Sequence, residues 1–384
     1  MKKHTPAIIY LDHSATTEPY PEVILRMGQV LCDSYGNPSS THSAGRDARI
    51  IIEESRREIA GIIGASPSEV FFTSGGTESD NTVLIGATMA GVRRIITSPI
   101  EHHAITATAS HLSSMGVSIN YVHIKENGDI DLEHLSHLLE QPSEGITLVS
   151  LMHVQNEIGN IYDINAIGNL CHAHNAWFHT DAVQGMCHLN YNLKNMPVDF
   201  LSASSHKFHG PKGIGFLYVK SGIVLPSLLH GGEQERGMRS GTENVPAIAA
   251  MSLALKMNNE ERTEDHTHIL ELKNHLISRL KEIEGVRFNG RCTDEKHSIP
   301  SLVSVTLPIK KDPSMVLLQL DMKGICVSAG SACMAGAVKD SFVISTLYGD
   351  NNPMKGMPTL RISMGKWNVK EEIDIAVDAI KALL

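Results

Sequence analysis

The sequence has few cysteines, and their spacing fits neither a disulfide framework nor a common metal motif. Six cysteines occur among 384 residues, and none forms a Cys-x-x-Cys pair. A chain of this length buries enough apolar surface to fold without disulfides. The pattern therefore indicates a reducing, cytoplasmic location. Cys171 and His174 are potential metal ligands, but no second ligand pair accompanies them, and we expect no metal site.

Long apolar runs and an excess of positive charge are also missing. No run approaches the roughly 18 apolar residues of a membrane-spanning helix. The short apolar run before Asp12 is too brief for a secretory signal. The net charge is −9, with acidic and basic residues interspersed, so no basic stripe marks a nucleic-acid surface. We therefore expect no membrane or direct nucleic-acid partner.

The first two thirds of the sequence alternate between apolar strand patterns and amphipathic helix patterns. This alternation predicts a mostly parallel sheet with helices on both faces, which is an α/β fold. Predicted strands cover 70–73, 94–98, 117–122, 146–152, 177–180, 198–202 and 213–219. Predicted helices cover 21–33, 45–63, 78–90, a stretch beginning near 102, 132–139 and 164–174.

A long helical pattern with candidate breaks starts near Val245 and runs to about Ile283. Because 384 residues favour two domains over one, we interpret this stretch as a connector. Beyond it the pattern predicts strands at 301–307, 324–327 and 359–363, and helices at 313–320, 341–348 and 370–384. These elements form a smaller α+β domain, which the strand at 8–11 can join. The predicted large domain covers 14–258, and the small domain covers 1–13 and 259–384.

Lys207 lies in a polar turn between two apolar strand patterns. Burying a bare ammonium there is costly. An imine with pyridoxal 5′-phosphate (PLP) removes that cost, and this is how PLP enzymes use a lysine. A solvated turn lysine, the interpretation we favour for Lys212, remains the alternative from this segment alone.

Two further turns suit the same cofactor. Ser74-Gly-Gly-Thr-Glu78 joins a strand to a helix, and open N–H groups at a helix start bind anions such as phosphate; it is neither a P-loop nor a Gly-x-Gly-x-x-Gly turn. Asp181 follows a buried strand, where ligands of α/β sheets gather, and an acid there can protonate the ring nitrogen. Gln184 can reach the ring oxygen. Helix capping is the alternative for both turns.

Two other side chains fit a PLP site. His102 follows a strand and can stack on a planar ring or move protons; a helix-start histidine without a role is the alternative. Arg361 lies in a strand pattern and can clamp a substrate carboxylate with two hydrogen bonds. Its alternative is an inter-domain salt bridge.

Cys333 lies in Val327-Ser-Ala-Gly-Ser-Ala-Cys-Met-Ala-Gly-Ala337, a stretch of small residues with little to anchor it. An accessible thiol of this kind is a nucleophile rather than a core cysteine. We expect 328–337 to be mobile, because Cys333 would have to move between substrate and acceptor.

Taken together, these motifs resemble the NifS/IscS-type cysteine desulfurases. The resemblance covers almost the whole chain, in order and with similar spacing. It is carried by Tyr10-Leu-Asp-His-Ser-Ala-Thr-Thr17, Tyr35-Gly-Asn-Pro-Ser-Ser40, Phe72-Thr-Ser-Gly-Gly-Thr-Glu78, Asn156-Glu-Ile-Gly159, His179-Thr-Asp-Ala-Val-Gln184, Ser205-His-Lys207, Arg239-Ser-Gly-Thr-Glu-Asn244 and Gly330-Ser-Ala-Cys333.

The resemblance implies a PLP-dependent transferase of fold type I in the class V aminotransferase family. It also implies the residues that would hold the cofactor: Lys207 as the imine, Asp181 at the ring nitrogen, Gln184 at the ring oxygen, His102 stacked on the ring with Asn156 nearby, and Gly76, Thr77, Ser204 and His206 at the phosphate. Thr242 would reach the phosphate from a second subunit, so the resemblance implies a homodimer.

For the substrate, the resemblance implies that L-cysteine is bound through its carboxylate by Asn37, Asn156 and Arg361. Cys333 would attack the substrate sulfur and carry it as a persulfide, leaving L-alanine. A sulfur-acceptor protein would receive it, either a tRNA thiouridylase or an iron–sulfur scaffold. The chain stops soon after its last helix, which favours tRNA thiolation.

Small departures from the family pattern concern loops and not the reaction: His13-Ser14 stands where many relatives have Asn-Asn, and Ala329 where a second serine is usual. A selenocysteine lyase or another class V PLP enzyme is the main alternative. Such an enzyme needs Lys207 and Asp181 but not Cys333. A protein without PLP that only binds a sulfur acceptor is a further alternative.

Overall fold

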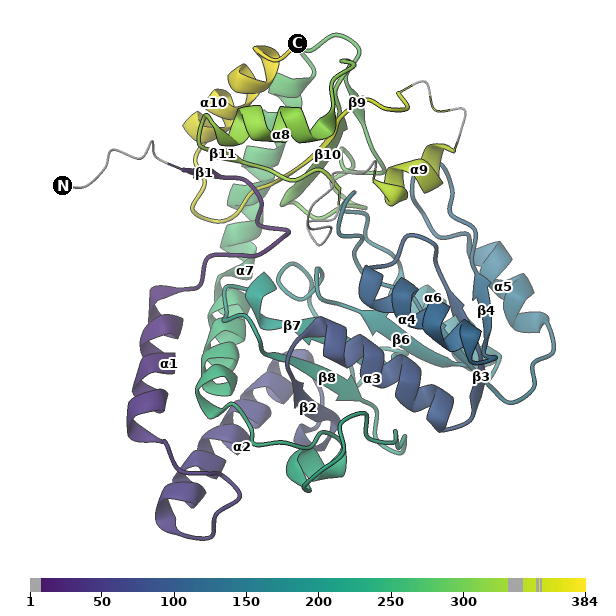
Figure 1. Ribbon diagram of the computed structural model, residues 1–384, viewed down its shortest axis with the longest axis vertical. Helices are drawn as coiled ribbons and strands as arrows, with labels where there is room; N and C mark the ends of the chain where they lie inside the picture. Colours follow the sequence, from purple (N-terminus) through teal and green to yellow (C-terminus); the bar gives the residue numbers. More distant parts are fainter. Residues whose placement is uncertain (1–7, 331–340, 350–351, 353) are drawn as a thin grey trace.

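The computed structural model describes residues 8–330, 341–349, 352 and 354–384. Cys333 lies outside these residues, as does most of the segment that we expect to be mobile. The described chain forms a larger part and a smaller part connected by one long helix, as Figure 1 shows. No helix within these ranges is long and apolar enough to cross a membrane.

The larger part is built on a seven-stranded sheet within the described residues. In spatial order its strands are β2 (Val70–Thr73), β8 (Gly215–Val219), β7 (Phe200–Ser204), β6 (Trp177–Asp181), β5 (Ile146–Ser150), β3 (Val92–Thr97) and β4 (Ser118–Tyr121). Strand β8 runs antiparallel to both of its neighbours, and the other neighbouring pairs are parallel. The predicted α/β fold with a mostly parallel sheet is confirmed.

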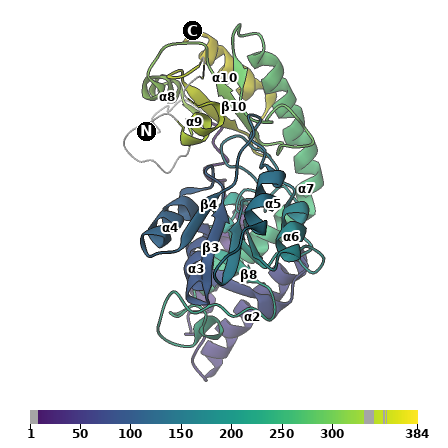
Figure 2. The ribbon, with the colours of Figure 1, turned by 90° about the vertical axis from the view of Figure 1, so that its right-hand side faces the viewer.

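Helices cover both faces of this sheet, and Figure 2 shows them from the side. Helices α3 (Gly76–Met89) and α4 (His103–Ser114) pack on one face through a cluster that includes Leu84 and Ile105. The other face is covered by α1 (Pro21–Asp33), α2 (Ser43–Ile63), α5 (Leu132–Glu140), α6 (Ile164–Ala173) and the start of α7 (Val245–Leu280). Burial on both faces explains why the strands read as continuous apolar runs.

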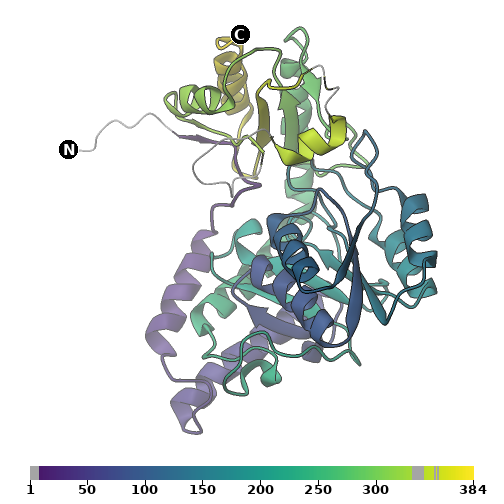
Figure 3. The same ribbon diagram turned by 45° about the vertical axis from the view of Figure 1, so that its right-hand side comes forward.

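The smaller part contains a three-stranded sheet in the order β12 (Thr359–Ser363), β10 (Leu302–Thr306) and β9 (Arg287–Phe288), as far as the structure describes it. Helices α8 (Pro313–Asp321), α9 (Phe342–Tyr348) and α10 (Lys370–Lys381) accompany it. Strand β1 (Ile9–Tyr10) pairs in parallel with β11 (Ile325–Cys326), so the N-terminal strand joins this part as predicted. Figure 3 shows the chain then descending to α1.

Helix α7 is continuous over 36 residues, about 54 Å at 1.5 Å per residue, so the predicted interruption is wrong. Its first half, up to Leu255, packs in the cluster beneath the large sheet. Its second half, from Ile269, packs in the cluster beneath β10 and β12. One helix thus spans both cores, and the predicted domain boundary at 258/259 falls between these two packing regions.

Candidate active site

A cavity of about 180 Å³ opens at the carboxyl ends of β6 and β7 and reaches across to β12. This is the edge at which open α/β sheets bind their ligands. Ten residues that we singled out from the sequence line it together: Gly76, Thr77, His102, Asn156, Asp181, Gln184, Ser204, His206, Lys207 and Arg361. They come from both parts of the molecule, so the cavity depends on how the two parts pack.

Lys207 ends a single 3₁₀ turn (Ser205–Lys207) that follows β7. Its Nζ donates hydrogen bonds to the backbone oxygens of Ser14 (2.5 Å) and Ala15 (2.9 Å). Those carbonyl oxygens belong to the turn after β1, which crosses from the smaller part. The amine is therefore held at the cavity wall by acceptors that carry no charge.

Asp181 is the last residue of β6, and its Oδ1 accepts a hydrogen bond from the backbone N–H of Val183 (2.9 Å). Burial raises the pKa of the Asp181 carboxyl, and the nearby His102 and Lys207 oppose that rise. Gln184 Nε2 donates to the backbone oxygen of Ser14 at 2.7 Å. The strand end thus directs an acid and an amide into the cavity that contains Lys207.

The proposed phosphate end is the start of α3, which begins at Gly76 and not at Glu78 as predicted. The N–H groups in a first helical turn lack helical acceptors and attract anions. A Cβ at Gly76 would lie 2.6 Å from Val183 Cγ2, so the turn has no room for a side chain there. Across the cavity, His206 Nδ1 lies within hydrogen-bond distance of Thr16 Oγ1, at 3.2 Å. Burial lowers the pKa of His206 to about 4, so its imidazole is neutral near pH 7.

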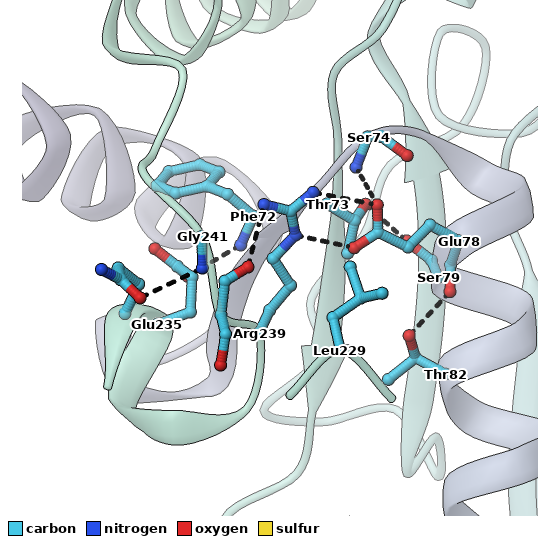
Figure 4. A network of polar contacts seen from close by, with 12 residues as sticks. Phe72, Thr73, Ser74, Glu78, Ser79, Thr82, Leu229, Glu235, Arg239 and Gly241 are labelled. Carbon is cyan, nitrogen blue, oxygen red and sulfur yellow. Dashed lines mark hydrogen bonds and ion pairs between the residues drawn. The ribbon is translucent and has the colours of Figure 1, made fainter. Parts of the chain in front are cut away.

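Glu78 supports this turn from outside the cavity, as Figure 4 shows. Its Oε2 accepts from the backbone N–H of Ser74 (2.8 Å), and its Oε1 accepts from Arg239 Nε (2.9 Å). In the same figure, Glu235 accepts a hydrogen bond from the Phe72 N–H (2.9 Å). Glu235 also pairs with the buried Arg56 (2.7 Å). Sequence reasoning gave these side chains no role, although Glu78 and Arg239 lie in quoted motifs.

Arg361, on β12, is 2% exposed. It donates to the backbone oxygen of Asn156 (3.1 Å) and to Asp12 Oδ1 (3.1 Å). Its Nε has no hydrogen-bond partner among the described residues. Arg361 lines the cavity, and a buried guanidinium with an unused donor suits an anionic ligand. The ion pair with Asp12 orients the guanidinium, but Asp12 lies in the same predicted small domain as Arg361, so this pair is not the inter-domain salt bridge considered as an alternative.

His102 is the N-cap of α4, and its Nδ1 accepts from the Ala104 N–H at 3.2 Å. Behind it, Glu101 is 1% exposed and accepts from Ser98 Oγ (2.7 Å) and the Met152 N–H (3.0 Å). Burial raises the pKa of Glu101 to about 8. This buried acid was not anticipated, because a glutamate beside a turn is ordinarily exposed.

Two predicted site residues are not brought to the cavity. Asn37 is exposed in the connection between α1 and α2, and its Oδ1 accepts from the Ser39 N–H (2.9 Å), a local turn contact. A single chain therefore does not place Asn37 at the substrate. Thr242 lines a separate cavity of about 170 Å³ with Ser74 and Arg239, away from its own Lys207. Cys333 lies outside the described residues.

Comparisons with known proteins agree with this geometry. The family model described as "Aminotransferase class-V" matches residues 9–375. The chain belongs to the class V aminotransferase family. Its relatives place it with the NifS/IscS-type cysteine desulfurases, which are PLP-dependent enzymes.

Two relatives and one solved structure illustrate this placement. A Bacillus subtilis (strain 168) protein that bears the name IscS 1 is 40% identical, over 98% of this chain and 99% of that protein. Cysteine desulfurase IscS of Escherichia coli O9:H4 (strain HS) is 38% identical, over 97% of this chain and 92% of that protein. A solved structure titled NifS-like protein superposes with a TM-score of 0.89 at 34% identity, covering 98% of this chain and 99% of that one.

The residues present fit PLP, judged by their own chemistry. The cavity offers an amine at Lys207, an acid at Asp181, and open N–H groups where Gly76 excludes a side chain. These groups match an aldehyde, a basic ring nitrogen and a phosphate. Arg361, with its unused Nε donor, remains for the carboxylate of an amino acid.

Proposed function

We propose that this desulfurase removes sulfur from L-cysteine and passes it to an acceptor protein through Cys333. In the balanced step, the Cys333 thiol takes the substrate sulfur to form a persulfide, and L-cysteine leaves as L-alanine. The observation that carries the proposal is that Lys207, Asp181 and Arg361 line one cavity although they lie far apart in the sequence.

PLP, when bound, supplies an electron sink that stabilises negative charge on the substrate. We assign Lys207 to hold the cofactor and move a proton between Nζ and the substrate. Asp181 and Gln184 would orient the ring through its nitrogen and oxygen, and His102 would stack on it. Gly76, Thr77, Ser204 and His206 would bind the phosphate.

Arg361, with Asn156 beside it, would bind the substrate carboxylate.

The strand that carries Arg361 also pairs with the chain that leads to Cys333. The backbones of Ser328 and Arg361 exchange two hydrogen bonds, of 3.2 Å and 2.7 Å. The segment that leads to Cys333 therefore departs from beside the carboxylate site. Five residues can extend about 17 Å, which is ample for a thiol to approach a substrate held there.

A second copy of the chain would complete the site, because Thr242 does not line the cavity of its own chain. We therefore propose a homodimer. We further propose that the large domain covers 14–258, that the small domain covers 1–13 and 259–384, and that the enzyme is cytoplasmic. The acceptor would be a tRNA thiouridylase or an iron–sulfur scaffold protein.

The test uses Cys333→Ala and Lys207→Ala, with Cys32→Ala as a matched control because Cys32 is an exposed cysteine in α1. We expect Cys333→Ala to bind PLP with an unchanged visible absorbance and to produce no alanine from cysteine. Lys207→Ala should lose the visible band of the lysine-bound cofactor. The control should keep both, and mass spectrometry should find the persulfide on Cys333. Undiminished alanine production by Cys333→Ala would refute the proposal and favour another PLP enzyme of this family.

A further inference from the structure

Asp80 is a buried acid in the same cavity, and the mechanism above gives it no role. It lies in the second turn of α3 and is 1% exposed. Its Oδ1 has no hydrogen-bond partner among the described residues. A buried, unpaired carboxylate oxygen is costly, so the position calls for a physical explanation.

A second carboxyl group lies beside it. Ligand atoms of Asp80, Asp181 and His102 are all within 4.8 Å of one another, the only such three-residue group in the described part of the chain. Two carboxylates this close and this deeply buried cannot both be ionised, because neither water nor the protein interior screens their repulsion. One of them must keep a proton.

Apart from His102, which belongs to the same three-residue group, the groups around Asp80 do not neutralise a second negative charge. His179 Nε2 lies 3.6 Å from Asp80 Oδ1, but this imidazole is bonded to Ser150 Oγ (2.8 Å) and Ser202 Oγ (3.0 Å). Burial lowers the pKa of His179 to about 3, so it is neutral. Glu101, also buried, is itself neutral near pH 7, because burial raises its pKa to about 8, so it supplies no positive charge.

The surroundings decide which acid keeps the proton. Asp181 Oδ1 accepts the Val183 N–H, and His102 and Lys207 favour its charged form. Asp80 has the Ser202 hydroxyl to favour its charge, but burial and the neighbouring charge of Asp181 raise its pKa well above the usual range. The anion is therefore better stabilised on Asp181.

We propose that Asp80 is a positioning residue: it carries one proton at neutral pH and so leaves Asp181 as the single carboxylate that faces the cofactor's ring nitrogen. The inference rests on the proposed PLP site. Asp181, the acid at the ring nitrogen, then forms one carboxyl pair with Asp80, and the net charge of that pair is −1. Above the pH at which Asp80 ionises, the pair would carry a second negative charge, which would favour the protonated ring nitrogen further.

The direct test reads the proton itself. In protein labelled with ¹³C at the aspartate carboxyl groups and freed of cofactor, one resonance should stay at the protonated position at pH 7 and titrate only at higher pH. That resonance should be missing in Asp80→Asn. In Asp181→Asn it should titrate at a lower pH than in the original protein, because the neighbouring charge that raises the Asp80 pKa is gone. Label confined to aspartate separates it from Glu101. The proposal is overturned if no aspartate is protonated at pH 7, or if the protonated resonance remains in Asp80→Asn.

A second readout uses the cofactor. Asparagine mimics a neutral Asp80, so the pH midpoint of the PLP absorbance in Asp80→Asn should match that of the original enzyme. Asp181→Asn should shift it by about one pH unit or more, which reports a lost charge. A shift that large in Asp80→Asn would mean that Asp80 is ionised and would refute the inference. If PLP does not bind the original enzyme, the proposed function fails, while the aspartate spectrum still decides the charge of Asp80. The spectrum of the unsubstituted protein serves if a variant does not fold.

Discussion

Glu101 offers a quantitative test of the buried charges around the site. Its two carboxyl oxygens accept from Ser98 Oγ and from the Met152 N–H, and the residue is 1% exposed. Replacing Glu101 by glutamine keeps the shape and removes the ionisable group. We expect Glu101→Gln to stabilise the cofactor-free protein at neutral and alkaline pH.

The sign follows from the direction of the pKa shift. Burial raises the pKa of Glu101 from 4.5 to about 8. Between these values the unfolded chain has lost this proton and the native protein still holds it, so stability falls as pH rises. Each pKa unit corresponds to ~1.36 kcal/mol. The raised pKa of Glu101 therefore lowers the free energy of unfolding by about 3 kcal/mol at pH 7 and by at most about 5 kcal/mol at pH 8 and above.

The assay is urea unfolding of the cofactor-free protein and of Glu101→Gln between pH 5 and pH 9. The stability difference should be smallest at pH 5, grow through pH 7 and level off above pH 8. Glu54→Gln is the matched control, because Glu54 is exposed on α2, and its difference should stay near zero throughout. A difference for Glu101→Gln that does not change with pH would refute the raised pKa.

Two further substitutions test the substrate and phosphate ends. Arg361→Lys keeps the positive charge but loses the planar guanidinium, and a charge-assisted hydrogen bond contributes about 1.5–3 kcal/mol. We therefore expect KM for cysteine to rise about 10- to 150-fold, while the PLP absorbance stays unchanged. An unaltered KM would contradict the proposed role of Arg361 in binding the substrate carboxylate. Gly76→Ala places a Cβ 2.6 Å from Val183 Cγ2, so PLP affinity measured by absorbance titration should fall at least about tenfold, a cost of about 1.4 kcal/mol. Gly28→Ala, whose Cβ meets nothing within 4 Å, is the control and should bind PLP normally; equal affinities in the two variants would argue against a tight phosphate turn.

The sequence predicted the elements that carry a single strong signal. Helix α1 spans Pro21–Asp33 as predicted, because Pro21 suits the first turn of a helix. Strand β12 also matches, at Thr359–Ser363. The interruption predicted in α7 is wrong, and the charged patch at 258–265 explains the error. The patch faces the crossing between the two cores, where Asp265 pairs with Lys366 (3.3 Å) and Asn258 is buried. These charges stabilise one continuous helix through tertiary contacts that a local pattern does not contain.

Site residues were predictable where a reactive side chain follows a strand, as Asp181 and Lys207 do, because the sheet brings such positions together. Three other kinds of contribution were not predictable. Backbone acceptors such as the Ser14 oxygen have no residue signature. Asp80 and Glu101 look like solvated acids until burial is known. Asn37 shows the limit of transfer by motif, since its place in the sequence pattern does not reveal that it is exposed and accepts a hydrogen bond within its own turn.

One short segment links both ends of the site. Asp12 accepts from Arg361 and also from Ser328 Oγ (2.7 Å), just before the segment that contains Cys333. Two residues later, the backbone oxygens of Ser14 and Ala15 accept hydrogen bonds from the Lys207 amine, and the Ser14 oxygen also accepts one from the Gln184 side chain. Residues 12–15 therefore fix the guanidinium of Arg361 relative to the amine of Lys207. Because both sets of contacts depend on the same four residues, a shift between the two parts of the molecule would disturb both side chains at once. If Arg361 and Lys207 have the roles that we propose, the short segment after the N-terminal strand is a structural requirement of the chemistry.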